Sequence, residues 1–517
     1  MNLFSQHDLR AKPMTSTTRP LNSLLHGTLR ASGAVGLCGA SQCAGAHSFG
    51  TVYNLPVPFW MYAYGATAAL IVSFVIVAYF ARVPMADAAA RSGGDRAIAG
   101  KVRVGGRWLV LLRIVSVFTL ALTIVAGFVG TRDTNTNINM TLFWIIFALG
   151  CYYLTALVGD VYGLANPWRA LCCVIEAGFP NAFRPRIAYS TRLAYYPALL
   201  LYVAFIWIEL FGQTQPHSLA VVLLAYTAIN LAGAALVGKE VWFRYGEFFA
   251  IMFRLAGKIA PVEYVRDVGA TERYGIRLRK PFVALLDEPA EHGSLLLFVL
   301  FMLSSTAFDG IHETLPWVSL FWKDIYPALA ALLNQPYLVL IDFYYYWQWA
   351  MLVVSPFVYL ALYLLFIWLA KRAAASATSV RTLALRFALS LVPIAFVYNI
   401  THYYTLLVSQ GINFVRLISD PFGFGWDLFG TAGSFATPIV LDAGGVWHTQ
   451  VGLILLGHIV GVYLAHVEAL RNFPNPRRAI VSQLPMLLLM VLFTTAGLWI
   501  LSLPIAAGQV VQPTPGG

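Results

Sequence analysis

Long apolar runs separated by short polar segments make up most of this chain. Ten can be delimited, at residues 58–80, 108–130, 141–163, 191–212, 218–238, 293–308, 346–370, 384–408, 446–467 and 479–504. Several exceed the roughly 18 apolar residues expected of a membrane-spanning helix, and they are continuous, unlike transmembrane β-strands. The pattern therefore predicts an all-α fold, a polytopic transmembrane helix bundle with about ten spans. We expect the short sixth helix to extend back toward Val283.

Composition supports this interpretation. The chain is 59% hydrophobic and 11% charged, with a mean hydropathy of +0.71, whereas soluble domains carry about 25% charged residues. The sequence contains no P-loop, no G-x-S-x-G elbow, no H-E-x-x-H and no CxxC motif, and the predicted outer loops lack cysteine. We therefore expect the lipid bilayer to be the main partner, with residues 47–508 forming one transmembrane domain.

The distribution of basic residues predicts which connections face the cytoplasm. If the first span begins outside, only Arg132, Lys323 and Arg416 fall in outer connections. Every other Lys or Arg between residues 81 and 478 that lies outside a predicted span falls in an inner connection. This asymmetry follows the positive-inside rule, so the net charge of +11 reflects topology and anionic lipid, not nucleic acid. Both mature termini should lie outside, and 509–517 reads as a flexible tail.

The N-terminal region has the pattern of a signal peptide. Basic residues precede the weakly apolar segment "ASGAVGLCGASQCAGA", which ends in the small-x-small sequence Ala44-Gly45-Ala46. We therefore predict a cleaved signal peptide over residues 1–46, with His47 as the new N-terminus. The alternative is an uncleaved cytoplasmic tail. With a signal peptide, the chain belongs in the inner membrane of a bacterial cell as a multi-pass protein.

Polar groups at membrane depth are costly, and they are therefore candidates for function. In the eighth span, "NITHYYTLLVSQG" places Asn399, His402, Thr405 and Ser409 on one helix face. This face predicts a polar surface that opens outward. The alternative is an interhelical hydrogen bond that only stabilises packing, worth about 0.6 kcal/mol.

Other ionisable residues could join this polar face. Asp309 and His312 are three residues apart at the outer mouth of the sixth span, and His458 lies near the middle of the ninth. Because histidine and carboxylate ligands suit a divalent ion, we predict Asp309, His402 and His458 as catalytic residues. The same three residues with His312 form the predicted metal-binding set, for an ion whose identity the sequence does not give. His466, at the inner end of the ninth span, is expected to be an interfacial residue near Glu468.

The outer connection 409–445 is the longest on its side. It contains "SDPFGFGWDLFGTAGSFATP", which is rich in glycine and aromatic residues. Long connections without clear secondary structure are usually functional or disordered, and the aromatic content argues against disorder. We predict a lid over the polar face, with a lipophilic small-molecule substrate contacting Asn399, Trp426, Asp427 and Phe429.

Six segments spread along the chain carry a family resemblance: "GDVYGLANPWRAL" (159–171), "KEVWFRYGEFFAIMF" (239–253), "SSTAFDG" (304–310), "THYYTLLVSQG" (401–411), "SDPFGFGWDLFGTA" (419–432) and "VGLILLGHIVGVYLAH" (451–466). In this order they resemble the bacterial integral-membrane proteins called fenitrothion hydrolases, and the segment "AHSFGTVYNLPVPFWMYAYG" is similar too. The resemblance implies an enzyme that hydrolyses an organophosphate triester and releases a nitrophenol. It leaves open a second associated membrane subunit.

Three classes of function therefore remain open. The first is a membrane-bound phosphotriester hydrolase, in which a metal-activated hydroxide would suit the uncharged substrate. The second is a metal-handling or transport protein, since the α-amine and imidazole of an exposed His47 could chelate a copper-like ion. The third is a non-catalytic subunit of a membrane hydrolase.

Overall fold

A computed structural model of the chain describes residues 58–80, 103–104, 106–266, 274–333, 337–434, 439, 441–473 and 475–503. The chain divides into two units, 1–47 and 48–517, and all described residues belong to the second. The predicted signal peptide (1–46), His47 and the tail (509–517) lie outside the described residues.

The predicted all-α polytopic bundle is confirmed. Within the described residues, nine helical segments are long and apolar enough to cross a membrane. They are α1 (Phe59–Phe80), α3 (Gly106–Val129), α4–η2–α5 (Ile138–Met140, Thr141–Cys151, Tyr152–Val158), α9 (Pro216–Val237), α12 (Gly293–Ile311), α15 (Tyr337–Ala373), α16–η5–α17 (Val380–Phe387, Ala388–Leu391, Val392–Gly411), α19 (Ala443–Asn472) and α20 (Pro476–Ser502). The predicted fourth span is the shorter helix α8 (Tyr196–Phe211), whose 16 residues extend about 24 Å.

Two helix boundaries differ from the prediction. The sixth helix does not extend back toward Val283, because α12 begins at Gly293 and the His292 side chain caps it by accepting a hydrogen bond from the Ser294 N–H. Residues Val283–Leu286 instead form a separate 3-10 turn, η3. The seventh helix, α15, begins nine residues earlier than predicted and has 37 residues. It is therefore about 55 Å long, well beyond a hydrocarbon core of roughly 30 Å.

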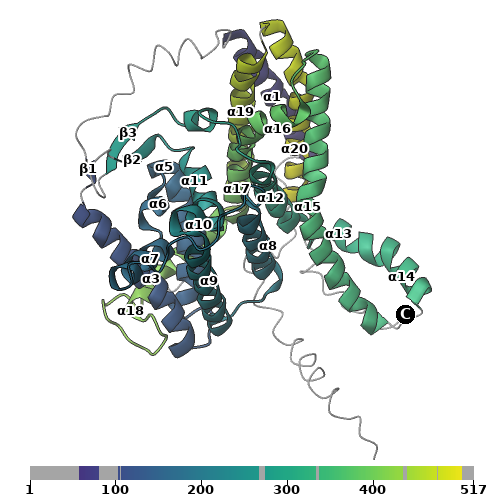
Figure 1. The fold of residues 1–517 in the computed structure, drawn as a ribbon. Helices are drawn as coiled ribbons and strands as arrows, with labels where there is room; N and C mark the ends of the chain where they lie inside the picture. The colour runs from purple at the N-terminus through teal and green to yellow at the C-terminus, as the bar shows by residue number, and fades with distance from the viewer. Residues whose placement is uncertain are drawn as a thin grey trace, which may run out of the picture. The chain divides into compact units, whose positions relative to one another are not determined.

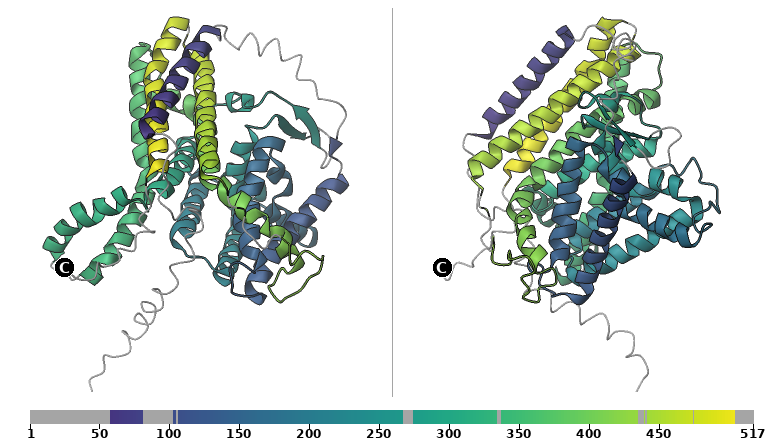
Figure 2. Two further views of the ribbon diagram at one scale, coloured as in Figure 1. Left: turned by 180° about the vertical axis from the view of Figure 1, so that it is seen from behind. Right: turned by 90° about the vertical axis from the view of Figure 1, so that its left-hand side faces the viewer.

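The helices form two groups. One contains α1, α15 and α19, which pack against α20, and the other contains α3, α4–η2–α5 and α9, which α8 joins through α11 (Phe248–Gly257). Figures 1 and 2 show α12 and α17 running between these groups. α12 packs against α15, α17 and α8, and α17 packs against α19 and η2. The two central helices thus contact both groups.

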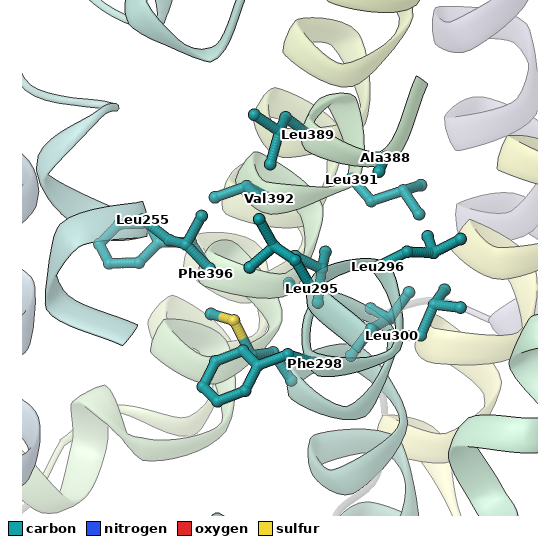
Figure 3. Packing of buried hydrophobic residues seen from close by; sticks show 14 of the residues in the cluster. Leu255, Leu295, Leu296, Phe298, Leu300, Ala388, Leu389, Leu391, Val392 and Phe396 are labelled. Carbon is teal, nitrogen blue, oxygen red and sulfur yellow. The ribbon is translucent and has the colours of Figure 1, made fainter. Parts of the chain in front are cut away.

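Burial follows this arrangement. In the most apolar part of α12, 83% of the residues are buried, against 17% in α1. Figure 3 shows leucine and phenylalanine side chains of α12, including Leu295, Leu296 and Phe298, interleaved with residues of η5 and α17. A helix that is apolar on all sides suits a central position in a membrane bundle, whereas α1 exposes its apolar side chains to lipid.

The segment between α9 and α12 is more structured than its sequence indicates. It forms α10 (Lys239–Tyr245), α11 (Phe248–Gly257) and the antiparallel strands β2 (Val262–Arg266) and β3 (Tyr274–Leu278), with β1 (Arg103–Val104) pairing at the edge of β3. This small sheet, in the order β1-β3-β2, was not expected. α11 packs against α5, α6 (Val161–Ala165) and α8.

The connections gather at two ends of the bundle. Among the predicted inner connections, Arg244 pairs with Glu291, and Arg471 donates to the Leu286 carbonyl. Among the predicted outer ones, the Thr131 N–H donates to the Phe422 carbonyl at 2.8 Å, and Arg416 donates to the Asn135 carbonyl at 3.1 Å. The contacts agree with the predicted alternation of spans, and which end faces the cytoplasm stays a prediction.

Candidate functional site

The two central helices bring Asp309 and His402 into direct contact. His402 Nε2 of α17 lies 2.7 Å from Asp309 Oδ2 of α12, and each side chain is 7% exposed. The hydroxyl of Tyr403 donates a hydrogen bond of 2.6 Å to the same carboxylate oxygen. A buried carboxylate in an apolar environment requires a partner of opposite charge or a hydrogen-bond donor at such distances. Asp309 is thus the centre of the site.

Asp309 sits in the last turn of α12, which ends at Ile311. His312 caps this end, with its Nδ1 2.9 Å from the Asp309 carbonyl oxygen and 3.9 Å from Oδ1. The His312 ring stacks on Phe308 at 5.5 Å and meets Phe211 of α8 edge-on. The helix continues through Gly310 to Ile311, and it places His312 beside Asp309, as their spacing of three residues predicted.

Glycines set the position of α17. A Cβ at Gly457 of α19 would lie 2.2 Å from Val397 Cγ2, and one at Gly461 would lie 3.1 Å from the Ser390 carbonyl oxygen. Gly457 and Gly461 form a G-x-x-x-G pattern, which lets two membrane helices approach closely. Gly497 of α20 makes room for the Tyr398 ring in the same way. This packing fixes the helix from which His402 and Tyr403 project.

A further acidic residue, Glu209, joins the cluster from α8, which belongs to the helix group of α3 and α9. It lies near the outer end of α8 and interacts electrostatically with Asp309 and His402, and with the Tyr403 side chain. Our sequence analysis missed both Glu209 and Tyr403. A lone glutamate in the apolar run "YVAFIWIELF" was a signal of the same kind as Asp309, since ionised groups at membrane depth are rare. We define the outer cluster as Glu209, Asp309, His402 and Tyr403.

His458, predicted to join Asp309 and His402, has other surroundings. It is fully buried in α19, with Nδ1 2.9 Å from the Ile454 carbonyl oxygen and its ring 5.7 Å from that of Tyr398. Its Nε2 has no hydrogen-bond partner among the described residues. None of these contacts reaches the outer cluster. His466 is buried, and its Nδ1 lies 3.0 Å from Gln483 Oε1 of α20, while its position at the inner membrane interface stays a prediction.

Asn399 takes part in a separate interhelical contact. Its side-chain and backbone oxygens accept hydrogen bonds of 3.0 and 3.1 Å from the Tyr153 hydroxyl of α5. The predicted polar face of α17 is therefore divided between two partners, with Asn399 facing α5 and His402 facing α12. In its present contacts Asn399 acts as the packing hydrogen bond that we considered as the alternative. Its role in substrate binding stays a prediction.

The outer connection 409–445 does have ordered structure. It contains the short helix α18 (Asn413–Ser419) and a turn in which Asp420 accepts hydrogen bonds from the Phe424 and Gly425 N–H groups. Asp427 likewise accepts from Ala432 N–H. The turn accepts backbone hydrogen bonds from Thr131 and from Ile138 at the start of the third span. Trp426 and Phe429 are exposed, so their role as substrate contacts in a lid stays a prediction.

The predicted metal-binding set can be compared with this geometry. Two ligands of one tetrahedral Zn²⁺ at 2.0–2.1 Å would lie about 3.3 Å apart, whereas Asp309 and His402 are 2.7 Å apart and contact each other directly. Among the residues that the structure describes, no three His, Cys, Asp or Glu side chains are arranged to hold one ion. As it stands, the pair is arranged for proton exchange, and metal binding stays a prediction.

Comparison with known proteins adds no relative: no family model, curated protein or solved structure matches the chain. The resemblance to fenitrothion hydrolases therefore stays a prediction that rests on the six segments.

Proposed function

We propose that the protein is a membrane-bound hydrolase of uncharged aryl organophosphate triesters, such as fenitrothion, with its active site at the outer cluster. The observation that carries the proposal is the buried contact of 2.7 Å between His402 Nε2 and Asp309 Oδ2. An imidazole held against a carboxylate is an arrangement for general-base catalysis, because the carboxylate stabilises the imidazolium that forms. The resemblance of the six segments gives the substrate class.

In the proposed reaction, His402 takes a proton from water, and Asp309 stabilises the charge on its ring. The resulting hydroxide forms a bond to phosphorus, the bond between phosphorus and the aryl oxygen breaks, and a nitrophenolate leaves with the bonding electrons. Asp309 and His402 contact each other directly, so the proposed proton transfer uses only these two side chains and water. The hydrolysis needs no reactant other than water.

Aromatic residues beside the cluster support a lipophilic substrate. Phe211 and Phe308 pack against His312. Trp317 packs against Phe308, and Trp349 of α15 contacts Phe211. The indole N–H groups of Trp317 and Trp349 are buried and have no hydrogen-bond partner among the described residues. Since a buried donor without a partner is unfavourable, we propose that a phosphoryl oxygen or sulfur of the substrate accepts from one of them.

The test is an assay of the purified full-length chain in detergent with an aryl phosphotriester that releases a nitrophenol. His402→Gln can still donate a hydrogen bond to Asp309 but cannot act as a base, and we expect it to lower kcat by at least 100-fold, within the usual range for general-base catalysis. His448→Gln is the matched control, because His448 is exposed on α19 and lies outside the cluster.

The outcomes separate the three classes of function. Absence of turnover by the folded wild-type chain would contradict the hydrolase, and turnover by His402→Gln equal to that of wild type would contradict the assigned site. Stoichiometric bound metal without turnover would favour the metal-handling class. Turnover that appears only after a second membrane subunit is added would favour the accessory role. Localisation in a bacterial inner membrane is part of the proposal and can be checked by membrane fractionation.

A further inference from the structure

A second polar region lies among the predicted inner connections, away from the outer cluster. An open cavity of about 510 Å³ is lined by residues of α11, α6, the strand β2 and the turn η3. Its size falls within the range of pockets that hold a small ligand. Its lining includes four basic residues (Arg169, Arg254, Lys258 and Arg279) and four acidic residues (Asp160, Glu263, Asp287 and Glu288), and this charged character distinguishes it from the aromatic surroundings of Asp309.

Two of these cations have no carboxylate partner. Arg254 and Lys258 are four residues apart at the end of α11, and side chains at this spacing lie on the same helix face. Arg254 donates to the Arg244 carbonyl at 3.0 Å, and the Lys258 ammonium lies 3.5 Å from the Ala284 carbonyl. In the part of the chain that the structure describes, neither forms an ion pair. Each is partly buried, and like charges at this spacing repel.

The nearby carboxylates do not neutralise them. Glu263 is already shared between Arg277 and Arg279. Asp287 and Glu288 line the cavity but are exposed, so solvent screens their charge. Asp160 is held by the Gly163 N–H at 2.8 Å, and burial raises the pKa of its carboxyl. Arg254 and Lys258 thus place two basic groups on the cavity wall that no carboxylate of the described residues contacts as an ion pair.

Arg279 has a different function from the two unpaired cations. Its guanidinium donates to the Gly257 and Ala260 carbonyls, at 2.6 and 3.1 Å, and so satisfies the end of α11. Arg279 therefore holds the wall of the cavity in place. Arg254 and Lys258 each contact one carbonyl instead of two. Burial lowers the pKa of Lys258, and the charges of Glu288 and Asp287 offset this only in part.

We infer that this cavity is a binding site for the phosphate group of a small phosphate ester or of a phospholipid headgroup, held by Arg254 and Lys258. A guanidinium offers a planar fork to phosphate oxygens, and an ammonium adds a compact charge. The volume exceeds that needed for a single inorganic ion, so the rest of the ligand has room beside the phosphate. The site is independent of the proposed hydrolase, whose uncharged substrate would not need these cations.

Binding can be tested on the full-length chain with two kinds of probe. Glycerol 3-phosphate added to protein in neutral detergent tests a soluble ester, and nanodiscs of phosphatidylglycerol or phosphatidylcholine, followed by native mass spectrometry, test a lipid headgroup. We expect Lys258→Met and Arg254→Gln each to weaken binding of the probe that wild type retains by tenfold or more. Arg381→Gln, an exposed arginine on α16, is the matched control and should stay within twofold of wild type.

A stability measurement separates ligand binding from a structural role. Without probe, Lys258→Met should unfold at the same temperature as wild type or higher, since a repelling charge has been removed. Retention of either probe supports the site, and the probe identifies the source of the phosphate. The inference is overturned if folded wild type retains neither probe, if Lys258→Met binds as wild type does, or if Lys258→Met lowers the unfolding temperature without changing affinity.

Discussion

Charged side chains have different partners at the outer cluster and at the cavity among the predicted inner connections, here called the inner cavity. At the outer cluster, Asp309 is contacted by His402 and Tyr403 through one carboxylate oxygen, at 2.7 and 2.6 Å. At the inner cavity, Arg254 and Lys258 line about 510 Å³ of space and pair with no carboxylate within the described residues. A charge compensated within the protein can take part in chemistry on a neutral substrate. A basic group beside a cavity that no carboxylate contacts directly leaves its hydrogen-bond donors available to a ligand from outside.

Removal of one partner of the outer pair, Asp309 and His402, should have the largest effect. Asp309→Ala would leave His402 buried without its carboxylate, and breaking such a pair typically costs 3–5 kcal/mol of unfolding free energy. We expect a loss of this size in denaturant unfolding of the purified chain in micelles. Lys258→Met in the inner cavity should cost nothing in the same measurement.

The double variant Asp309→Ala/His402→Ala is the control for this prediction. If the two residues compensate each other, it should be less destabilised than the sum of the single variants. Strictly additive losses would mean that the contact between them does not contribute to stability.

A smaller change tests the hydroxyl of the outer cluster. Tyr403→Phe removes the hydrogen bond of 2.6 Å to Asp309 but keeps the ring and its packing against His402. We expect a loss of about 1.5–3 kcal/mol in unfolding free energy, the usual contribution of a hydrogen bond to a charged group. Tyr404→Phe is a suitable neighbour control, because among the described residues the Tyr404 hydroxyl contacts the neutral Val446 carbonyl and Thr449 at the rim of the bundle. Equal losses in the two variants would contradict a special role for the Tyr403 hydroxyl.

The smallest expected effect concerns the pH dependence at the inner cavity. Burial raises the pKa of Asp160 above its ordinary value of 3.8, while the Gly163 N–H and Arg254 offset only part of the shift. A carboxyl with a raised pKa favours folding when protonated, and this contribution is lost as pH rises from about 4 through the folded-state pKa. Asp160→Asn should therefore unfold a few degrees above wild type at pH 7 and at the same temperature near pH 3.

Thermal unfolding at the two pH values measures this difference. Asp427→Asn, in the exposed outer turn, serves as the control and should show no such dependence. A stabilisation by Asp160→Asn that persists unchanged at pH 3 would show that ionisation of Asp160 is not its cause.

Much of the fold follows from sequence alone, because few backbone structures are stable inside a membrane. In hydrocarbon, backbone groups must be satisfied within the segment, so a long apolar run becomes a helix. Nine described segments of this kind match predicted spans. Asp309 and His402 were recognisable as candidates for the same reason, since ionisable groups are expensive at membrane depth. The G-x-x-x-G pattern of Gly457 and Gly461 was also present in the sequence, although only the structure shows that it faces α17.

The partners of these residues were decided by tertiary packing. Helical periodicity places Asn399 and His402 on one face of α17. In the structure, however, Asn399 contacts a residue of α5, and His402 contacts a residue of α12. His458 has the depth expected of a ligand but turns toward Ile454 and Tyr398. Glu209 reaches Asp309 only because α8 of one helix group packs against α12 between the groups. Sequence fixes which groups enter the membrane, because that cost is local. Which groups meet depends on how helices far apart in the chain rotate and pack, and no local pattern records that.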